Sequence, residues 1–365
     1  MPDLKSYIKK LLNEFSSRCT PLRYHLARRR FPVHLTMGAK EAEAALSQIY
    51  PDKGESCLCH NYIDPKHDLH IIVPVYNVEA YLTECLDSIF NQETNYSFFV
   101  SLIDDGSTDR SGEILDTYVG RLDKNMYDGR VEVIHQKNGG LSAARNRALE
   151  NIRGRYVMFV DSDDSLTPTA VESLLTAAIE SGADIAEGCF QNGSSHGFAW
   201  GKVYHAELFG NVRFPRGYWF EDTVNIFFLY PVSRKMISVP GIHYYYRPTP
   251  GSIMNSLGNN PKVMDSIWVS RRVLNDYFSS GHHATEQLFH DFLLDIYSSV
   301  SHLSKLGDER AMQAMFVIEC RMAKEHFMSC LLDNTKHTLP LHLRQLADAL
   351  HEENYRKFRS LPTLR

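Results

Sequence analysis

Short apolar runs and helix-like segments alternate along the chain from about residue 69 to about residue 190. Between the apolar runs, residues such as Leu82, Leu86 and Phe90 repeat at helical spacing, and Thr167-Pro168 supplies an N-cap and a first-turn proline. This alternation predicts a mostly parallel sheet that is covered by helices on both faces. The predicted strands are 71–75, 98–103, 131–134, 156–160 and 183–186.

The two ends of the chain have helical patterns without intervening strands. Residues 1–30 place apolar side chains at helical spacing among many lysines and arginines, which predicts one or two basic amphipathic helices. Apolar positions such as Leu288, Phe292 and Ile296 predict helices after Pro261. We therefore expect an N-terminal basic helical extension (1–67), an α/β domain (68–260) and a C-terminal helical domain (261–365).

The composition excludes several classes of protein. Hydrophobic residues make up 43% and charged residues 23% of the 365 residues, as in a globular protein, and a net charge of −5 gives no indication of a nucleic-acid partner. No run approaches the roughly 18 apolar residues of a membrane span, and the start lacks a signal-peptide stretch. The seven cysteines form no disulfide framework. We expect a cytoplasmic protein, with peripheral membrane contact through the basic N-terminus as an alternative to simple packing of that segment.

An acidic cluster follows the predicted strand 156–160. Asp161, Asp163 and Asp164 lie within four residues, and their carboxylates repel one another unless a cation or hydrogen-bond donors neutralise them. Mg²⁺ or Mn²⁺ takes oxygen ligands and bridges diphosphates, so this cluster predicts a metal and nucleotide-sugar site. A turn that is merely capped by aspartates remains the alternative.

Two further polar loops are expected at the same edge of the sheet. Asp104 and Asp105 follow the strand 98–103, and a carboxylate here accepts a hydrogen bond from a base such as uracil, or simply caps the turn that follows. The glycine-rich segment 138–142 lets backbone approach a ligand before the helix that carries Arg145. Arg145 pairs either with the acidic cluster or with a phosphate.

Six motifs resemble the inverting family-2 glycosyltransferases, over about residues 69–256 and in the order of that family. The resemblance implies an α/β GT-A fold with a Rossmann-like sheet, in addition to the N-terminal and C-terminal helical parts. The motifs are 72–77, 103–109, 138–146, 159–164, 200–204 and 220–222.

The resemblance also implies a role for individual residues. Asp222 would be the catalytic base, although an N-cap is its structural alternative. Asp163 and Asp161 would hold the divalent metal, Mg²⁺ or Mn²⁺. The acceptor side would include Trp200, Lys202 and Glu221, where Glu221 could instead be a first-turn acid that interacts with the helix dipole. The residues that would bind the donor are Pro74, Tyr76, Asn77, Asp105, Gly140, Arg145, Asp161, Ser162, Arg247 and Ser252.

The reaction implied is transfer of a hexose or N-acetylhexosamine from a UDP-sugar to a hydroxyl of an acceptor glycan. The acceptor would be a polysaccharide, a lipid-linked oligosaccharide or a glycoconjugate, and inversion follows from a single metal-assisted displacement. A non-catalytic subunit that binds a sugar nucleotide or glycan is the alternative. The segment 189–199 is shorter than in typical members, so the acceptor pocket is open or completed elsewhere. We expect the C-terminal helices to bind the acceptor or to form a homo-oligomer contact.

Overall fold

The computed structural model describes residues 27, 30–249, 260–332 and 339–361. The chain forms two compact units: an α/β unit, Gly54–Ser252, and a helical unit that combines Met1–Lys53 with Ile253–Arg365. The division at residues 67 and 260 stays a prediction, and the compact units group the two ends of the chain together. The basic helices expected within residues 1–30 fall almost entirely outside the described residues.

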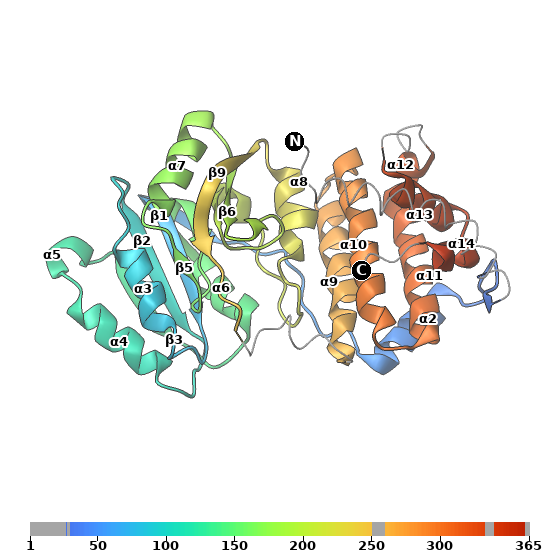
Figure 1. The fold of residues 1–365 in the computed structure, drawn as a ribbon, viewed down its shortest axis with the longest axis horizontal. Helices are drawn as coiled ribbons and strands as arrows, with labels where there is room; N and C mark the ends of the chain where they lie inside the picture. Colours follow the sequence, from blue (N-terminus) through green and yellow to red (C-terminus); the bar gives the residue numbers. More distant parts are fainter. Residues whose placement is uncertain (1–26, 28–29, 250–259, 333–338, 362–365) are drawn as a thin grey trace. The chain divides into compact units, whose positions relative to one another are not determined.

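The α/β unit is built on a nine-stranded sheet with the order β3-β2-β1-β4-β8-β6-β9-β5, and β7 pairs with β6 (Figure 1). β1 pairs in parallel with β2 and β4, and β8 lies antiparallel between β4 and β6. The predicted mostly parallel α/β fold is therefore confirmed. The strands are β1 (Tyr62–Val75), β2 (Phe98–Asp104), β3 (Val131–His135), β4 (Asn151–Phe159), β5 (Ser165–Leu166), β6 (Ile185–Phe190), β7 (Gly193–Ser194), β8 (Lys202–His205) and β9 (Met236–Tyr245).

Helices cover both faces of this sheet. On one face, the buried residues of α3 and α7 form a single core with every second residue of β1, such as Ile71 and Val73. On the other face, Phe159 packs against Phe214, and Arg145 of α6 lies over both rings. Burial on both faces explains why β1 ends in a continuous apolar run. The helices are α3 (Leu82–Phe90), α4 (Ser111–Arg121), α5 (Lys124–Tyr127), α6 (Leu141–Leu149) and α7 (Ala170–Ser181).

The strand order brings the polar motifs together. From β1 the chain moves to β2 and β3 on one side of the sheet, and then crosses to β4 on the other side of β1. Parallel sheets bind ligands beyond the carboxyl ends of their strands, where the strand order reverses in this way. The loops that follow β1, β2 and β4 leave from this edge, which positions the candidate site.

The helical unit packs residues from the start of the chain against the C-terminal helices. In Figure 1 the blue α2 (Ala39–Ile49) lies beside α11, and the backbone N–H of Tyr355 donates to the carbonyl of Val33 at 2.7 Å. Thr285 and Asp308 cap two of the helices by accepting hydrogen bonds from first-turn N–H groups. No helix among the described residues combines the length and apolar character that a membrane span requires. The C-terminal elements are η4 (Pro261–Met264), α9 (Asp265–Ser279), α10 (Glu286–Ser304), α11 (Glu309–His326), α12 (Met328–Leu332), α13 (Leu341–His351) and α14 (Tyr355–Ser360).

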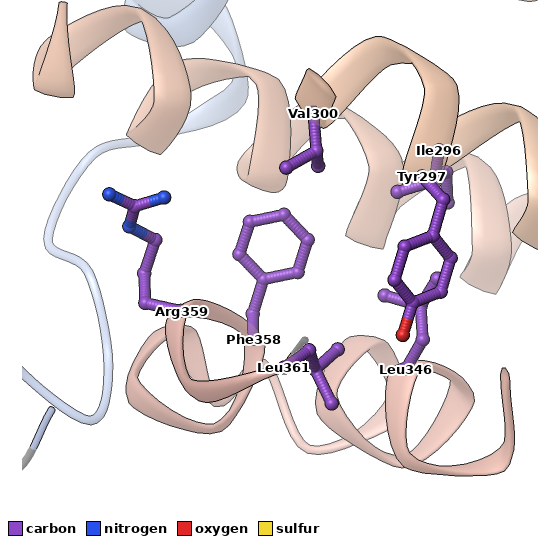
Figure 2. A pocket seen from close by; sticks show the side chains of 7 residues that line it. All are labelled: Ile296, Tyr297, Val300, Leu346, Phe358, Arg359 and Leu361. Carbon is purple, nitrogen blue, oxygen red and sulfur yellow. The ribbon is translucent and has the colours of Figure 1, made fainter. Parts of the chain in front are cut away.

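A small apolar cavity lies between α10, α13 and α14, as Figure 2 shows. Its volume is about 30 Å³. Pockets for small molecules usually measure about 300–1,000 Å³, so this one is a packing gap and not a ligand site. It is lined by Ile296, Tyr297, Val300, Leu346, Phe358, Arg359 and Leu361.

Two carboxyl groups in the helical unit have raised pKa values. Burial, together with the neighbouring charge of Asp295, raises the pKa of Glu319 to about 8, although Arg271 opposes this shift. Burial raises the pKa of Asp295 to about 7, against a hydrogen bond from Ser270. A carboxyl group with a raised pKa binds a proton more tightly in the folded than in the unfolded chain. The stability of this unit should therefore fall as the pH rises from about 4 to about 8.

We expect Glu319→Gln to raise the melting temperature at about pH 8.5 and to leave it near the wild-type value at about pH 5, because the wild-type group is already neutral there. Each such group contributes up to roughly 1.4 kcal/mol per pH unit in the window between its two pKa values. Thermal unfolding followed by circular dichroism at both pH values measures the effect. Glu325→Gln, at an exposed position of the same helix, is the control. An equal gain for Glu319→Gln at both pH values would contradict the assignment.

Candidate active site

The buried guanidinium of Arg145 joins the acidic motifs of the α/β unit. Arg145 lies in α6, and its side chain is only 1% exposed. Its terminal nitrogens lie 2.9 Å from oxygens of Asp161, Glu221 and Asp222. Arg145 was expected to pair either with the acidic cluster or with a phosphate, and in the structure it pairs with acidic side chains. The guanidinium fixes the loop after β4 to the segment that carries Asp222.

This group of side chains has more negative than positive charge, because one guanidinium faces three carboxylates. Burial opposes the charged form of Arg145, but the three carboxylates raise its pKa above the ordinary value. Burial raises the pKa of both Glu221 and Asp222, and Arg145 offsets part of that shift. The repulsion among these carboxyl groups is relieved by protons, as the raised pKa values indicate, or by a cation beside Asp161.

Asp222 is held by its side chain and does not cap the helix that follows. One carboxylate oxygen accepts a hydrogen bond from Arg145, and the other accepts from the backbone N–H of Ala199 at 3.1 Å. The N–H of Asn225 donates to the backbone carbonyl of Asp222, at the start of the π-helical turn η2 (Asn225–Leu229). The carboxylate remains 22% exposed, so a ligand hydroxyl can reach it.

A tyrosine that the sequence analysis did not select organises the acidic turn after β4. The N–H of Asp161 donates to the hydroxyl of Tyr244 at 3.0 Å, and this hydroxyl donates to Asp164 at 2.8 Å. Asp164 also accepts from the N–H of Arg247, so both of its oxygens are used within the protein. Burial and the charge of Asp161 raise the pKa of Asp164 to about 8. Asp164 thus shapes the turn, and the run of three tyrosines at 244–246 was the available signal for Tyr244.

Asp163 and Asp161 are the carboxylates that remain for a metal. Asp163 accepts a hydrogen bond from the hydroxyl of Thr249 at 3.2 Å, and burial together with the charge of Asp161 raises its pKa. Within the described ranges, no three His, Cys, Asp or Glu side chains form a ready metal cage. Mg²⁺ is typically held by one or two carboxylates that share it with substrate phosphates and water, and this pair of residues fits that arrangement.

Asp105, which was expected to bind the donor, ties the loop after β2 to the glycine-rich loop after β3. Asp105 accepts from Gln136 and from the N–H groups of Gly139 and Gly140, at 2.7 to 2.9 Å. Gly140 has a φ of 86°, which a side chain would disfavour, and it leads directly into α6. Asp105 therefore fixes the glycine-rich loop, and an ionised carboxylate retains lone pairs for a further donor.

Asn77 has a similar structural use. Its side-chain oxygen accepts from the N–H of Thr108 at 2.7 Å, and its own N–H donates to Ser107. Its φ of 52° is tolerated by asparagine better than by most residues. Pro74 lies near the end of β1, and the exposed Tyr76 follows this strand, so the tyrosine ring is open to a ligand.

Other expected donor-side residues occupy different positions. Arg247 donates to the backbone carbonyl of Asp163 and forms an ion pair with Glu84 at 2.7 Å. A phosphate would have to share or replace the Glu84 contact. Ser162 is buried within the acidic turn. Ser252 lies outside the described residues.

Lys202 is buried under the site and not at its surface. Its side chain is 0% exposed, and its ammonium donates to the Ser195 carbonyl, to Tyr230 and to Glu187. Burial lowers the pKa of Lys202 to about 8, despite its attraction to Glu187. The expectation that Lys202 contacts the acceptor therefore has no support in this geometry, because a sugar cannot reach the ammonium. The sequence signal for this buried ion pair was Glu187, a charged residue within an otherwise apolar strand.

Trp200 and Glu221 are also largely enclosed. The indole of Trp200 is 4% exposed and stacks on Tyr244, with ring centroids 4.5 Å apart. Glu221 is buried against Arg145, which accounts for its carboxylate without the helix dipole. A sugar therefore cannot contact most of the Trp200 ring directly, because other residues cover it.

The strand order of the sheet and the likeness to solved structures define the fold class, an α/β unit of the GT-A type. Residues 70–237 match the family model described as Glycosyl transferase family 2, so this segment is similar to the members of that family. Glycosyltransferase GlyA of Streptococcus pneumoniae serotype 4 is 37% identical in an alignment of 221 residues that covers 50% of this chain and 31% of GlyA. The match thus spans less than a third of the length of that relative.

Solved structures share the fold at low sequence identity. S. aureus TarS 1–349 in complex with UDP-GlcNAc has a TM-score of 0.60 and 20% identity, covering 80% of this chain and 89% of that one. The mannosyltransferase PcManGT from Pyrobaculum calidifontis, in complex with GDP-Man and Mn²⁺, has a TM-score of 0.50 and 14% identity. That comparison covers 96% of this chain and 97% of PcManGT. At these identities, the likeness establishes the fold.

The contacts of Arg145 predict a large effect on stability. We expect Arg145→Met to lower the free energy of unfolding by about 3–5 kcal/mol, because it leaves buried carboxylates without their cation. Arg145→Lys keeps the charge but cannot reproduce the planar fork, so its effect should be intermediate. Urea unfolding followed by tryptophan fluorescence measures both. Arg147→Met removes an exposed ion pair from the same helix and should cost less than about 1 kcal/mol. Equal losses at positions 145 and 147 would show that the buried group is not a stability centre.

Proposed function

We propose that this chain transfers a sugar from a UDP-sugar to a hydroxyl of an acceptor glycan, with inversion at the anomeric carbon. In a single displacement, Asp222 accepts the proton of the attacking hydroxyl while the nucleoside diphosphate departs. The match of residues 70–237 to the family model described as Glycosyl transferase family 2 supports the reaction class. Our proposal adds four points to this match: the UDP donor, the inversion, the acceptor and the cytoplasmic location.

The observation that carries the proposal is the shared guanidinium of Arg145. It contacts Asp222 and Asp161 at the same distance, 2.9 Å, and so fixes the proposed base relative to the proposed donor carboxylate. Catalysis by displacement requires this kind of fixed geometry, since the nucleophile and the leaving group must be held together in line. Asp222 combines partial exposure with a raised pKa, as a proton acceptor requires.

On the donor side, Asp163 and Asp161 would hold Mg²⁺ or Mn²⁺. When bound, such an ion would supply positive charge to the departing diphosphate. The presence of Mn²⁺ in PcManGT supports this part of the proposal. TarS is described with UDP-GlcNAc and PcManGT with GDP-Man, so the nucleotide has to be tested directly.

A sugar-nucleotide-binding subunit without catalysis is the competing function. It would need the donor side, Asp161 and Asp163, but not the arrangement around Asp222. The partly exposed, doubly hydrogen-bonded carboxylate at position 222 favours the enzyme. The enzyme would release a nucleoside diphosphate from the sugar nucleotide, whereas the binding subunit would not.

The metal assignment predicts the behaviour of Asp163→Ala. Isothermal titration calorimetry with UDP, in MnCl₂ and in EDTA, should give tighter binding with the metal in the wild type and no such difference in the variant. GDP titrated in parallel should bind at least about tenfold more weakly than UDP. Asp64→Ala, near the opposite end of β1, is the control and should bind as the wild type does. Metal-dependent UDP binding in Asp163→Ala would reject the assignment, and tighter binding of GDP would reject the UDP donor.

The base assignment predicts the behaviour of Asp222→Asn. Release of UDP from a panel of UDP-hexoses and UDP-N-acetylhexosamines should fall at least about 100-fold in kcat, because asparagine cannot accept a proton. UDP affinity should stay near the wild-type value, since Arg145 still has Asp161 and Glu221 as partners.

Glu221→Gln is the matched control for Asp222→Asn. It alters the other carboxylate on the same terminal nitrogen of Arg145, but at a buried position that a substrate does not reach. We expect it to affect stability more than kcat. An equal fall in kcat for both variants would assign Asp222 to structure. Absence of any release by the wild type would favour the binding subunit.

A further inference from the structure

Phe198 ends a stack of parallel aromatic rings in the α/β unit. Its ring centroid lies 4.6 Å from that of Trp200, with an angle of 10° between the planes. Trp200 stacks in turn on Tyr244 at 4.5 Å and 13°. Unlike these two enclosed rings, Phe198 remains 40% exposed. Stacking on Trp200 therefore sets the orientation of a ring that is still partly exposed.

The backbone around Phe198 is fixed as firmly as its ring. The N–H of Phe198 donates to the Ser195 carbonyl, and the adjacent Gly197 is held through Tyr230 and Asn225. Tyr204 donates to the carbonyl of Ala199 at 3.1 Å. A ring fixed in this way loses little conformational freedom when a ligand packs on it.

The position of Phe198 connects this ring to the proposed chemistry. The next residue, Ala199, donates its backbone N–H to the carboxylate of Asp222 at 3.1 Å. The exposed ring and the proposed base thus belong to one short, hydrogen-bonded structure. Single exposed apolar residues are common on protein surfaces, so exposure alone would carry no meaning. Here the exposed side chain belongs to the residue directly before Ala199, whose N–H holds the proposed base.

We propose that Phe198 is an acceptor-binding residue that stacks against the flat C–H face of a pyranose ring. The proposal rests on the proposed function, and it specifies the acceptor as a cyclic sugar and not an open-chain polyol. A pyranose presents several C–H groups on one face, which matches the negative face of an aromatic ring. An open-chain polyol has no such face. Trp200 takes part indirectly, by supporting the ring of Phe198.

Transfer from the UDP-sugar that the wild type uses best tests the proposal. The probes are methyl β-D-glucopyranoside, methyl β-D-galactopyranoside and methyl N-acetyl-β-D-glucosaminide, with ribitol and glycerol as open-chain comparisons. We expect at least one pyranoside to be an acceptor, and neither polyol. Phe198→Ala should raise the KM for that pyranoside by about tenfold, with the dissociation constant of UDP unchanged. Phe198→Trp should restore the wild-type KM, whereas Phe198→Leu, which is apolar but not flat, should not.

Tyr245→Ala provides the matched control. Tyr245 is 47% exposed and lies on β9 between Tyr244 and Tyr246, so its side chain points to the opposite face. Its removal should leave the pyranoside KM as in the wild type.

Three results would overturn the proposal: transfer to ribitol or glycerol as efficient as transfer to a pyranoside, no transfer to any pyranoside, or an unchanged KM in Phe198→Ala. In each case, UDP release from the donor in water shows that the donor side of the proposed function still stands. If the wild type releases no UDP, the proposed function itself has failed.

Discussion

The buried guanidinium of Arg145 is the interaction on which the candidate site depends. A cation without access to water is costly unless anions surround it, and here the anions come from three positions in two distant segments. The residues that pair with Arg145 are therefore held in place by electrostatics as well as by the chain. The rings of Phe159 and Phe214 enclose the guanidinium and limit the water that could weaken these pairs.

Side chains also hold the loops that follow β1 and β2 in place. Asp105 and Asn77 use their oxygens to hold backbone N–H groups of neighbouring loops, so the edge of the sheet is ordered before any ligand arrives. A site that is arranged in advance binds and reacts without first ordering its own groups. Residues of this kind combine a structural and a binding use within a single carboxylate or amide.

The parallel part of the fold followed from the sequence because its strands are buried on both faces and separated by helices with clear apolar periods. β8 and β9 were not predicted, since β8 is short and β9 contains Pro240 and Gly241, which weaken a strand pattern. The positions of the acidic motifs also followed from strand order. What the side chains contact did not, because the pairing of Lys202 with Glu187 arises only from the register of β8 on β6. Likewise, sequence alone does not tell whether Asp105 points to a ligand or to its own loop.

The grouping of both chain ends into one unit has a consequence for synthesis on the ribosome. The α/β unit is a continuous segment, Gly54–Ser252. In the helical unit, by contrast, α2 contacts α11, and the carbonyl of Val33 accepts a hydrogen bond from Tyr355, and both of these partners are translated much later. All residues of the sheet are therefore translated before the helical unit has its full set of partners. Contacts between residues that are far apart in sequence form slowly, so the early helix carries an unpartnered apolar face while the middle of the chain folds. The order of translation thus favours folding of the sheet first and completion of the helical unit last.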